Sequence, residues 1–390
     1  MKILFLGLFY DEEGLKQSYG EVKSGVQMAP HRFQTLLIKG LEENGVEVQS
    51  LNVLPGGTFP FNHRRLCIKD KRWGKENLRI GYLNLPFIKQ RTQEKKAYRY
   101  MKTALASSTP PDYIVCYYTH LPYLRALNRI KKEFPDIKTA LIMTEAVWGR
   151  GDIVDTPRAK KEGDKVVALS KVFDAFLPIT KHLKEPLEMG ERPYMVLDGV
   201  ADESAQKAKP FEGERKVFLY TGTIHKHFNL DTLIAAFSHL PEAELWLCGN
   251  LQDIGDAAQE LEDLPNVKYL GRVPFEDLQG YRDGCAYLIN PRQTTGSYTR
   301  YSFPSKLTEC LISGKPTVGY LLEGIGEEYY PYIQPLHAKD AKGLAEELGA
   351  IIQEDYAVAK ERAEKARSFI LREKTAKSQA KKVKEFLEKI

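Results

Sequence analysis

Short apolar runs alternate with amphipathic stretches along the first half of the chain. Residues 2–9 form an apolar run typical of a buried strand, and Phe33, Leu37 and Leu41 then recur at four-residue steps, as they would on one face of a helix. Gly45 is a stop signal for that helix. The further elements predicted in this half are strands at 46–53, 113–117, 139–143 and 172–179 and a helix at 121–134. This alternation is typical of a parallel sheet covered by helices.

The same alternation begins again after residue 214. The segment before it, 198–214, is polar and contains Pro210, as expected of a linker between domains. The predicted elements that follow are strands at 216–220, 244–248, 267–270, 286–289 and 317–320 and a helix at 231–238. Two successive series predict an α/β protein of two Rossmann-like, doubly wound domains, with a cleft between the carboxyl ends of their strands.

The end of the chain is predicted to be helical. Its apolar positions recur at helical spacing and form one stripe, which comprises Ala376, Ala380, Val383, Leu387 and Ile390. Such a stripe packs on another apolar surface, which belongs either to the second domain or to the first.

Composition narrows the class of protein. The 390 residues suffice for two domains, and 43% hydrophobic with 28% charged residues is usual for a soluble globular protein. No apolar run approaches 18 residues, so no membrane-spanning helix is expected. The apolar run at 3–8 is too short for a signal peptide and continues into the acidic residues 11–13, so a buried strand is the better interpretation.

Cysteine and histidine spacing argues against a metal site. The five cysteines are widely separated without a Cys-x-x-Cys pair, and the eight histidines show no ligand spacing. We therefore expect core cysteines, a reducing cytoplasmic compartment and no metal ligands.

The most informative segment is 301–316, Tyr-Ser-Phe-Pro-Ser-Lys-Leu-Thr-Glu-Cys-Leu-Ile-Ser-Gly-Lys-Pro. Pro304 and Ser305 are good starts for a helix at 306–312, and Gly314 ends it. Free N–H groups of the first turn and the Lys306 ammonium suit an anion such as a diphosphate. Glu309, one turn further, could accept hydrogen bonds from two adjacent hydroxyls, such as those of a ribose. An ordinary capped helix is the alternative.

This sequence motif resembles that of the retaining glycosyltransferases of the GT-B fold, family 4 (group 1), which carry Pro-Ser-Lys-Leu-x-Glu-x-Leu-x-x-Gly-Lys-Pro. The resemblance implies Ser305 and Lys306 on the donor diphosphate and Glu309 on the nucleotide ribose. Tyr301 stands where the family usually has a second Glu in contact with the donor sugar. Weaker matches in family order, at 1–53, 219–223, 245–249 and 267–273, extend the resemblance over nearly the whole chain.

The resemblance also implies a domain arrangement. Residues 1–203 would form an acceptor-side domain and 204–372 a nucleotide-sugar-binding domain, with the helix 373–390 packing back on the first. Gly-x-Gly-x-x-Gly, the fingerprint of dinucleotide-binding folds, follows no predicted strand, which counts against a dehydrogenase.

The resemblance implies that two loops of this chain contact the donor. Residues 20–26, with Gly20 and Gly25, are predicted to form a loop after the first strand. Ser24 and Gly25 match a Gly-rich loop of the family there, although an ordinary turn would look the same. Gly222 and Thr223 open the phosphate loop of the second domain. The family usually has Arg directly after that glycine and Lys about six positions later, and here these positions hold Thr223 and Phe228.

Candidates to replace those two cations are Lys226 and Arg292, each of which could also be a plain surface residue. Arginine suits a diphosphate because its planar fork binds two oxygens at once. Arg272 lies where the family reads the base, and it either stacks on the base or faces solvent.

In the first domain, Glu145 and Trp148 follow a predicted strand, where relatives contact the donor sugar or orient the acceptor hydroxyl. A carboxylate at a helix N-terminus is the competing explanation for Glu145. His120 is a lesser candidate, because a capping or core histidine is more common. Glu145, Arg292 and Lys306 are the predicted catalytic set.

Positive charge is concentrated at 64–102. This stretch has thirteen lysines or arginines, three acidic residues and therefore a net charge of +10, whereas the whole chain carries +5. Aromatic residues interleave with the charges. The pattern favours an anionic membrane surface or a lipid-phosphate acceptor. A solvated face remains the alternative, and no nucleic acid is expected.

Together these features predict transfer of a sugar from a nucleotide-diphosphate sugar to a hydroxyl of a glycan or lipid-linked acceptor, in cell-surface polysaccharide synthesis. The resemblance implies retention of configuration, no metal and no cofactor beyond the donor substrate. The expected location is cytoplasmic or peripheral at the inner face of the membrane. Two alternatives stay open: a sugar-nucleotide epimerase on the same fold, and a non-catalytic partner protein, because Tyr301, Thr223 and Phe228 depart from the family pattern.

Overall fold

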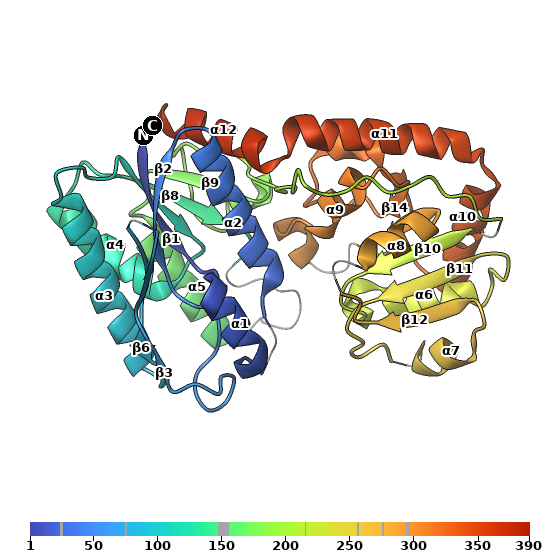
Figure 1. Cartoon of the computed structure of the whole chain (residues 1–390), viewed down its shortest axis with the longest axis horizontal. Coiled ribbons are helices and arrows are strands. Elements are labelled where there is room, and N and C mark those ends of the chain that lie inside the picture. Colours follow the sequence, from blue (N-terminus) through green and yellow to red (C-terminus); the bar gives the residue numbers. More distant parts are fainter. Residues whose placement is uncertain are drawn as a thin grey trace. The chain divides into compact units, whose positions relative to one another are not determined.

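The protein is described by a computed structural model that covers all residues except 24–25, 75, 147–155, 215, 256, 275–276 and 294–296. The chain divides into two compact units (Figure 1). The N-terminal unit comprises Met1–Val200, Tyr301–Phe303 and Ala376–Ile390, and the C-terminal unit comprises Ala201–Arg300 and Pro304–Thr375. These divisions lie close to the boundaries expected from the sequence, at 203/204 and 372/373.

A seven-stranded sheet forms the centre of the N-terminal unit, in the order β4-β5-β2-β1-β7-β8-β9. All neighbours in it pair in parallel except β4, which runs antiparallel to β5 at one edge. The strands are β1 (Lys2–Gly7), β2 (Glu47–Asn52), β4 (Lys71–Trp73), β5 (Asn77–Arg79), β7 (Tyr113–Tyr117), β8 (Lys138–Met143) and β9 (Ala175–Pro178). A separate antiparallel pair joins β3 (Cys67–Ile68) to β6 (Tyr82–Leu83).

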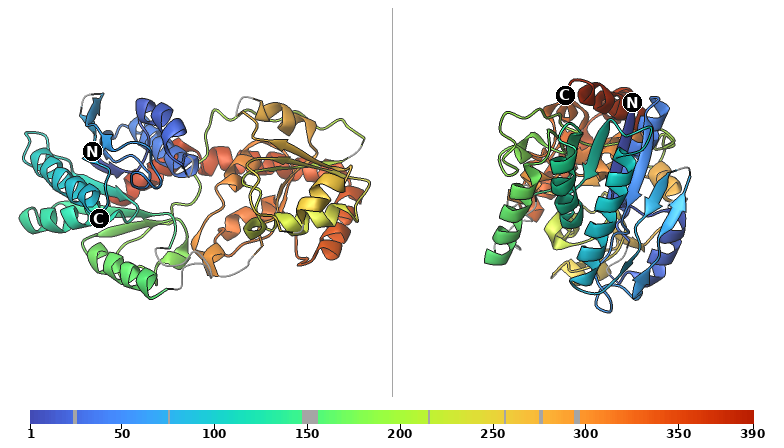
Figure 2. Two further views of the ribbon diagram at one scale, coloured as in Figure 1. Left: turned by 90° about the horizontal axis from the view of Figure 1, so that it is seen from below. Right: turned by 90° about the vertical axis from the view of Figure 1, so that its left-hand side faces the viewer.

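Helices cover both faces of this sheet. On one side lie α2 and α12, and on the other α3 and α4 (Figure 1). The helices are α1 (Glu12–Glu21), α2 (Met28–Glu43), α3 (Ile88–Leu105), α4 (Leu121–Glu133), α5 (Pro157–Ser170) and α12 (Ala376–Leu387), with a 3₁₀ turn at η2 (Lys181–Leu183). Both ends of the chain lie on this unit, close to each other (Figure 2).

The helix α1 differs from the sequence-based expectation, which placed a loop at 20–26. Gly20 instead lies in the last turn of α1. The helix forms because the Asp11 carboxylate accepts a hydrogen bond from the Gly14 N–H, and Glu12 and Glu13 place negative charge at the helix N-terminus. Ser24 and Gly25, the predicted contacts of that loop, lie outside the described residues.

The C-terminal unit is built on a six-stranded, all-parallel sheet in the order β12-β11-β10-β13-β14-β15. Its strands are β10 (Val217–Thr221), β11 (Glu244–Cys248), β12 (Val267–Gly271), β13 (Tyr287–Asn290), β14 (Thr317–Gly319) and β15 (Gln334–Pro335). Its helices are α6 (Leu230–Phe237), α7 (Ala257–Asp263), α8 (Leu278–Gly284), α9 (Lys306–Ile312), α10 (Ala341–Gln353) and α11 (Tyr356–Glu373). Short 3₁₀ segments are η3 (Lys226–Phe228) and η5 (Glu327–Tyr332), and η4 (Ser297–Tyr301) precedes α9.

The last helix, α12, packs on α2 of the N-terminal unit. Ala380, Val383 and Leu387 are fully or almost fully buried in one cluster with Leu37 and Leu41. The backbones approach closely at Gly40, where an added Cβ would lie 2.1 Å from the carbonyl oxygen of Ala376. The predicted apolar stripe thus faces the first sheet.

Hydrogen bonds lock both ends of this arrangement. The Asn44 amide donates to the carbonyl of Lys377 (2.9 Å), and the Gln379 amide donates to Asp198 (2.7 Å) and to the carbonyl of Gly199 (2.8 Å). Just beyond, in the C-terminal unit, the Ala201 N–H donates to the carbonyl of Lys374 (2.8 Å). The first and the last connection between the units, at 200/201 and 375/376, are therefore neighbours.

The close approach at Gly40 leads to a stability prediction. Gly40→Ala should lower the free energy of unfolding by about 1–3 kcal/mol, because the methyl group meets backbone that cannot move aside. Gly20→Ala is the matched control. It also lies in a helix, no described heavy atom lies within 4 Å of its added Cβ, and it should stabilise by about 0.5–1 kcal/mol. Denaturant unfolding of both variants measures the difference, and equal shifts would contradict the proposed packing constraint.

Candidate functional site

Glycine turns follow two adjacent strands of the C-terminal unit. Gly222 follows β10 and Gly249 follows β11, with φ angles of +155° and +156°. A Cβ on Gly249 would lie 1.6 Å from the Gly222 oxygen, so the two turns are in backbone contact and no larger residue fits. The Tyr220 hydroxyl donates to the carbonyl of Thr223 (2.8 Å) and fixes the first turn. Backbone groups are thereby held at the carboxyl edge of the sheet.

Arg292 lies at the same edge, two residues after β13. Its guanidinium carbon is 5.7 Å from the centre of the Phe228 ring, a cation–π distance. Burial raises the pKa of Tyr220, and the positive charge of Arg292 opposes that rise. The structure therefore brings Arg292 to η3, the 3₁₀ segment that follows the Gly222–Thr223 turn. Phe228, at the position of a family lysine, is the ring against which Arg292 packs.

Lys226 is held by Asp253. Its Nζ lies 2.6 Å from Asp253 Oδ2, and its backbone N–H donates to the Asp253 carbonyl at 2.9 Å. The hydrogen bond from Lys226 is the largest cause that lowers the pKa of the Asp253 carboxyl. Both side chains are about half exposed, so this ion pair is weak and exchangeable.

The helix α9 spans Lys306–Ile312, as predicted. Gly314 (φ +75°) ends it, and Thr317 begins β14. Ser305 is exposed and its side chain makes no capping hydrogen bond. Pro304 and Ser305 start the helix through backbone geometry, since Leu307 N–H donates to the carbonyl of Pro304 (2.8 Å).

Lys306 and Glu309 form an ion pair on the first turn of α9. Lys306 Nζ is 2.9 Å from Glu309 Oε2. A third residue, Arg282 of α8, places its Nη2 3.7 Å from the same oxygen. Sequence reasoning missed Arg282. Its spacing from Leu278 and Cys285, at four and three residues, puts it on the buried face of α8, and a charged residue there was the available signal.

The second lysine of the segment, Lys315, is structural. It is buried, and its Nζ donates to the carbonyls of Cys285 (2.7 Å) and Asp283 (3.1 Å), which end α8. Burial lowers its pKa from the usual lysine value. The Gly-Lys-Pro end of the segment thus joins α8 to β14.

Two other predicted residues of the nucleotide site have few described contacts. Arg272 is exposed and follows Gly271, which ends β12 with φ +69°. Tyr301 is half-buried at the end of η4. Neither position changes the interpretations given from the sequence.

Glu145 follows β8 of the N-terminal unit. Next to it, the Thr144 hydroxyl lies 3.3 Å from the Tyr117 hydroxyl. Burial raises the pKa of Tyr117 to about 12, and the negative charge of Glu145 adds to that rise. Trp148 lies outside the described residues.

His120 is a neutral, packed histidine. Its ring meets Tyr123 edge-on at 5.0 Å, and it precedes α4 without a side-chain capping bond. Burial lowers its pKa to about 3, with a smaller contribution from the charge of Lys89. These contacts favour the core interpretation over a role in proton transfer at neutral pH.

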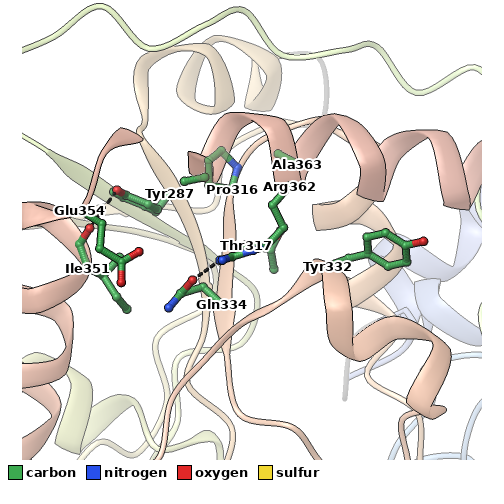
Figure 3. A pocket seen from close by; sticks show the side chains of 10 residues that line it. Tyr287, Pro316, Thr317, Tyr332, Gln334, Ile351, Glu354, Arg362 and Ala363 are labelled. Carbon is green, nitrogen blue, oxygen red and sulfur yellow. Dashed lines mark hydrogen bonds between the residues drawn. The ribbon is translucent and has the colours of Figure 1, made fainter. Parts of the chain in front are cut away.

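A pocket of about 280 Å³ of open space lies at the other edge of the second sheet (Figure 3). It is lined by Tyr287, Thr317 and Gln334, the first residues of β13, β14 and β15. The strands are parallel, so this edge is opposite to the glycine turns, and the pocket is separate from the candidate site.

The described residues contain no group of three or more histidine, cysteine or acidic side chains that could hold a metal ion. Nor do these residues include a helix with the length and apolarity needed to cross a membrane.

Part of the C-terminal unit is similar to a known protein family. Residues 215–354 match the protein family described as Glycosyl transferases group 1. The sequence matches none of the curated proteins at a significant level. The predicted resemblance to group 1 glycosyltransferases is therefore confirmed over this segment.

Solved structures share the fold of the entire chain. A sucrose-phosphate synthase from Thermosynechococcus elongatus is similar with a TM-score of 0.68 and 13% identity, over 100% of this chain and 98% of that one. The lipopolysaccharide outer core galactosyltransferase WaaB, in its apo form, is similar with a TM-score of 0.61 and 13% identity, over 100% of this chain and 99% of that one. HepE from Anabaena, in complex with UDP and glucose, is similar with a TM-score of 0.62 and 13% identity, over 100% of both chains. The predicted GT-B fold is confirmed.

Proposed function

We propose that this chain, a GT-B glycosyltransferase with a group 1 domain at residues 215–354, transfers a sugar from a nucleotide-diphosphate sugar to a hydroxyl of a glycan or lipid-linked acceptor. The observation that carries the proposal is the Lys306–Glu309 pair at the start of α9, on the same sheet edge as the Gly222 turn and Arg292. In open α/β sheets, ligands bind at the carboxyl edge of the strands. UDP is the first nucleotide to test, because HepE was solved with UDP and glucose.

The chemistry follows from charge. Breaking the bond from the sugar to the diphosphate leaves negative charge on the departing phosphate and positive character on the sugar. Arg292, Lys306 and the backbone N–H groups of Gly222, Thr223 and α9 supply fixed positive potential for that negative charge. Transfer proceeds with retention of configuration, without a metal ion and with no cofactor beyond the donor; full activity in EDTA is the check.

Lys306 has two anionic partners in this scheme. Without nucleotide it pairs with Glu309 at 2.9 Å, and on donor binding it turns to the diphosphate. Glu309 then accepts hydrogen bonds from the ribose hydroxyls. Ser305, exposed beside Lys306, contributes its hydroxyl to the phosphate, and Arg272 lies beside the base.

Glu145 serves the acceptor. Its carboxylate orients the attacking hydroxyl in the N-terminal unit, one residue after Thr144, whose hydroxyl lies 3.3 Å from that of Tyr117. Tyr301 replaces the usual sugar-contacting carboxylate and offers an aromatic ring instead.

Thermal unfolding in the presence of nucleotides and nucleotide sugars tests the proposal as a whole. A ligand at 100 times its dissociation constant adds about 2.7 kcal/mol to stability. Binding followed by sugar transfer to a glycan or glycolipid supports a transferase, and epimerisation of the donor without acceptor would support the epimerase alternative. Absence of any nucleotide-sugar binding would favour a non-catalytic protein.

Lys306→Ala should weaken binding of UDP by about 1.5–3 kcal/mol, the range for a hydrogen bond to a charged group, and should change binding of uridine far less. Calorimetry with both ligands measures the two losses. Lys207→Ala is the control, because it removes a lysine from an exposed ion pair with Glu364 in the same unit. Similar losses for UDP and uridine would remove Lys306 from the phosphate site.

Glu309→Gln keeps the side-chain shape and removes a charged acceptor. UDP should lose affinity by about 1.5–3 kcal/mol, whereas 2′,3′-dideoxy-UDP should be nearly indifferent, because it lacks the hydroxyls that Glu309 accepts from. Titration calorimetry of both nucleotides is the measurement. If Glu309→Gln weakens the binding of UDP and of 2′,3′-dideoxy-UDP equally, Glu309 has a structural role and does not bind the ribose.

A surface of the N-terminal unit suits an anionic membrane and a lipid-linked acceptor. Large apolar side chains are exposed around β3, β6 and the start of α3, which lie together in Figure 1. Phe87 is 84% and Phe61 71% exposed, and Leu66, Leu83 and Ile88 are exposed beside them. We call these five residues, with the exposed cations Arg64, Lys69 and Arg91, the basic apolar surface.

The structure sorts the charges of the basic stretch. Arg65 and Lys71 are engaged by Glu21 and Glu13 of α1, and Arg79 forms a buried ion pair with Asp11 at 2.7 Å. Arg64, Lys69 and Arg91 have no ion partner among the described residues, so they remain available to anionic lipid. Apolar insertion and cationic attraction act together at such surfaces. The protein would then work at the inner face of the membrane.

Changing Arg64, Lys69 and Arg91 together to Gln should weaken binding to vesicles of anionic lipid by about 3 kcal/mol at low salt, because each cation contributes about 1 kcal/mol. Co-sedimentation with vesicles measures it, and binding of UDP should be unchanged. The matched control changes three exposed lysines of the C-terminal unit, Lys339, Lys342 and Lys360, to Gln. Indifference of the wild type to anionic lipid at low salt would end the membrane proposal.

A further inference from the structure

Arg282 is a buried cation on α8 with an ion partner on α9. The residue is only 8% exposed, and the guanidinium lies near the thiols of Cys285 and Cys310, where its charge lowers the pKa of each thiol against the larger, raising effect of burial. Among the described residues, its ion partner is Glu309, with Nη2 3.7 Å from Oε2. A buried guanidinium is costly unless it is paired, so this contact has a reason to persist.

Two cations share one carboxylate oxygen here. Lys306 Nζ lies 2.9 Å and Arg282 Nη2 3.7 Å from Glu309 Oε2. The three side chains carry two positive charges and one negative, so the group has an excess positive charge before any ligand binds. Such an excess suits the arrival of an anion.

The two cations differ in mobility. Lys306 has a side chain 45% exposed, on the first turn of α9, and can turn away from Glu309 toward a phosphate. Arg282 is enclosed and comes from another helix, so it stays where it is when a ligand binds.

We propose that Arg282 is a positioning residue, which holds Glu309 for the ribose hydroxyls once the donor diphosphate has drawn Lys306 away. The inference rests on the proposed nucleotide site and assigns to it a residue outside the segment 301–316. In the free protein either cation can orient the carboxylate. In the nucleotide complex only Arg282 does so, because Lys306 is then engaged by phosphate.

This role differs from simple fastening of α8 to α9. A fastening contact would matter equally for every ligand, since losing it would loosen the unit as a whole. A positioning contact matters only for ligands that have both ribose hydroxyls, which need Glu309, and a diphosphate, which removes Lys306. The two roles therefore separate on the choice of ligand.

The test compares three ligands on Arg282→Gln: UDP, 2′,3′-dideoxy-UDP and uridine. UDP binding should weaken about tenfold, the size of coupling expected within one ion-pair network. Dideoxy-UDP lacks the hydroxyls and uridine leaves Lys306 on Glu309, so both should change less than about threefold on the same scale. Arg282→Lys should recover part of the loss, and adding Glu309→Gln to Arg282→Gln should cause little further loss.

Lys315→Met is the control for stability. It also removes a buried cation beside α8, but its partners are the carbonyls of Asp283 and Cys285, so it should lower Tm without changing the ratio of UDP to dideoxy-UDP affinity. Equal weakening of all three ligands by Arg282→Gln, or no weakening of any, would overturn the role of Arg282. If the wild type itself binds no UDP or does not distinguish it from dideoxy-UDP, the proposed nucleotide site fails instead.

Discussion

The close packing of the last helix on α2 is the constraint on which the N-terminal unit depends. Ile3 and Phe5 of β1 and Val115 of β7 point to the face that α2 and α12 cover, and all three are nearly inaccessible to solvent. Without α12 part of that apolar face would be open to water, at about 25 cal/mol for each Å² exposed. Gly40 is what permits the approach, because its missing side chain leaves room for the Ala376 backbone. Helix packing thus makes residues 376–390 part of a unit that begins at residue 1.

The C-terminal unit contains buried cations that hold the fold and more exposed cations that the proposed function assigns to the ligand. Lys315 is buried and donates hydrogen bonds to backbone carbonyls, whereas Lys306, nine residues earlier, is half exposed and pairs with a carboxylate. Arg292 packs on the aromatic ring of Phe228. A cation with a weak ion partner can exchange that partner for a phosphate, because an exposed ion pair contributes little free energy. Position relative to the sheet edge, more than residue type, distinguishes the cations that the proposed function assigns to the ligand from those that hold the fold.

Much of the fold could be predicted from sequence where local signals agree. The bounds of α9 follow from Pro304, Ser305 and Gly314, and the parallel strands follow from short apolar runs bounded by turns. The sequence misled at α1, where Gly20 suggested a loop although Asp11 and the acidic residues after it start a helix. It gave no sign of the two-residue strands β3 and β6, because such short pairs have no periodicity to detect. Arg282 was missed for another reason: its partner Glu309 is on a different helix, and contacts between helices leave no local pattern.

The two neighbouring connections have a consequence for how the protein can be divided. The chain leaves the N-terminal unit after Val200, re-enters it briefly at Tyr301–Phe303 and returns to it at Ala376, and the Ala201–Lys374 hydrogen bond joins the first and the last of these passages. A protease that cuts only one passage therefore leaves the units covalently joined through the others. A fragment that stops at Val200 would lack its covering helix, while a permuted chain that fuses residues 376–390 to the first segment would retain it. The N-terminal unit is discontinuous in sequence, so its boundaries cannot be found by truncation from one end.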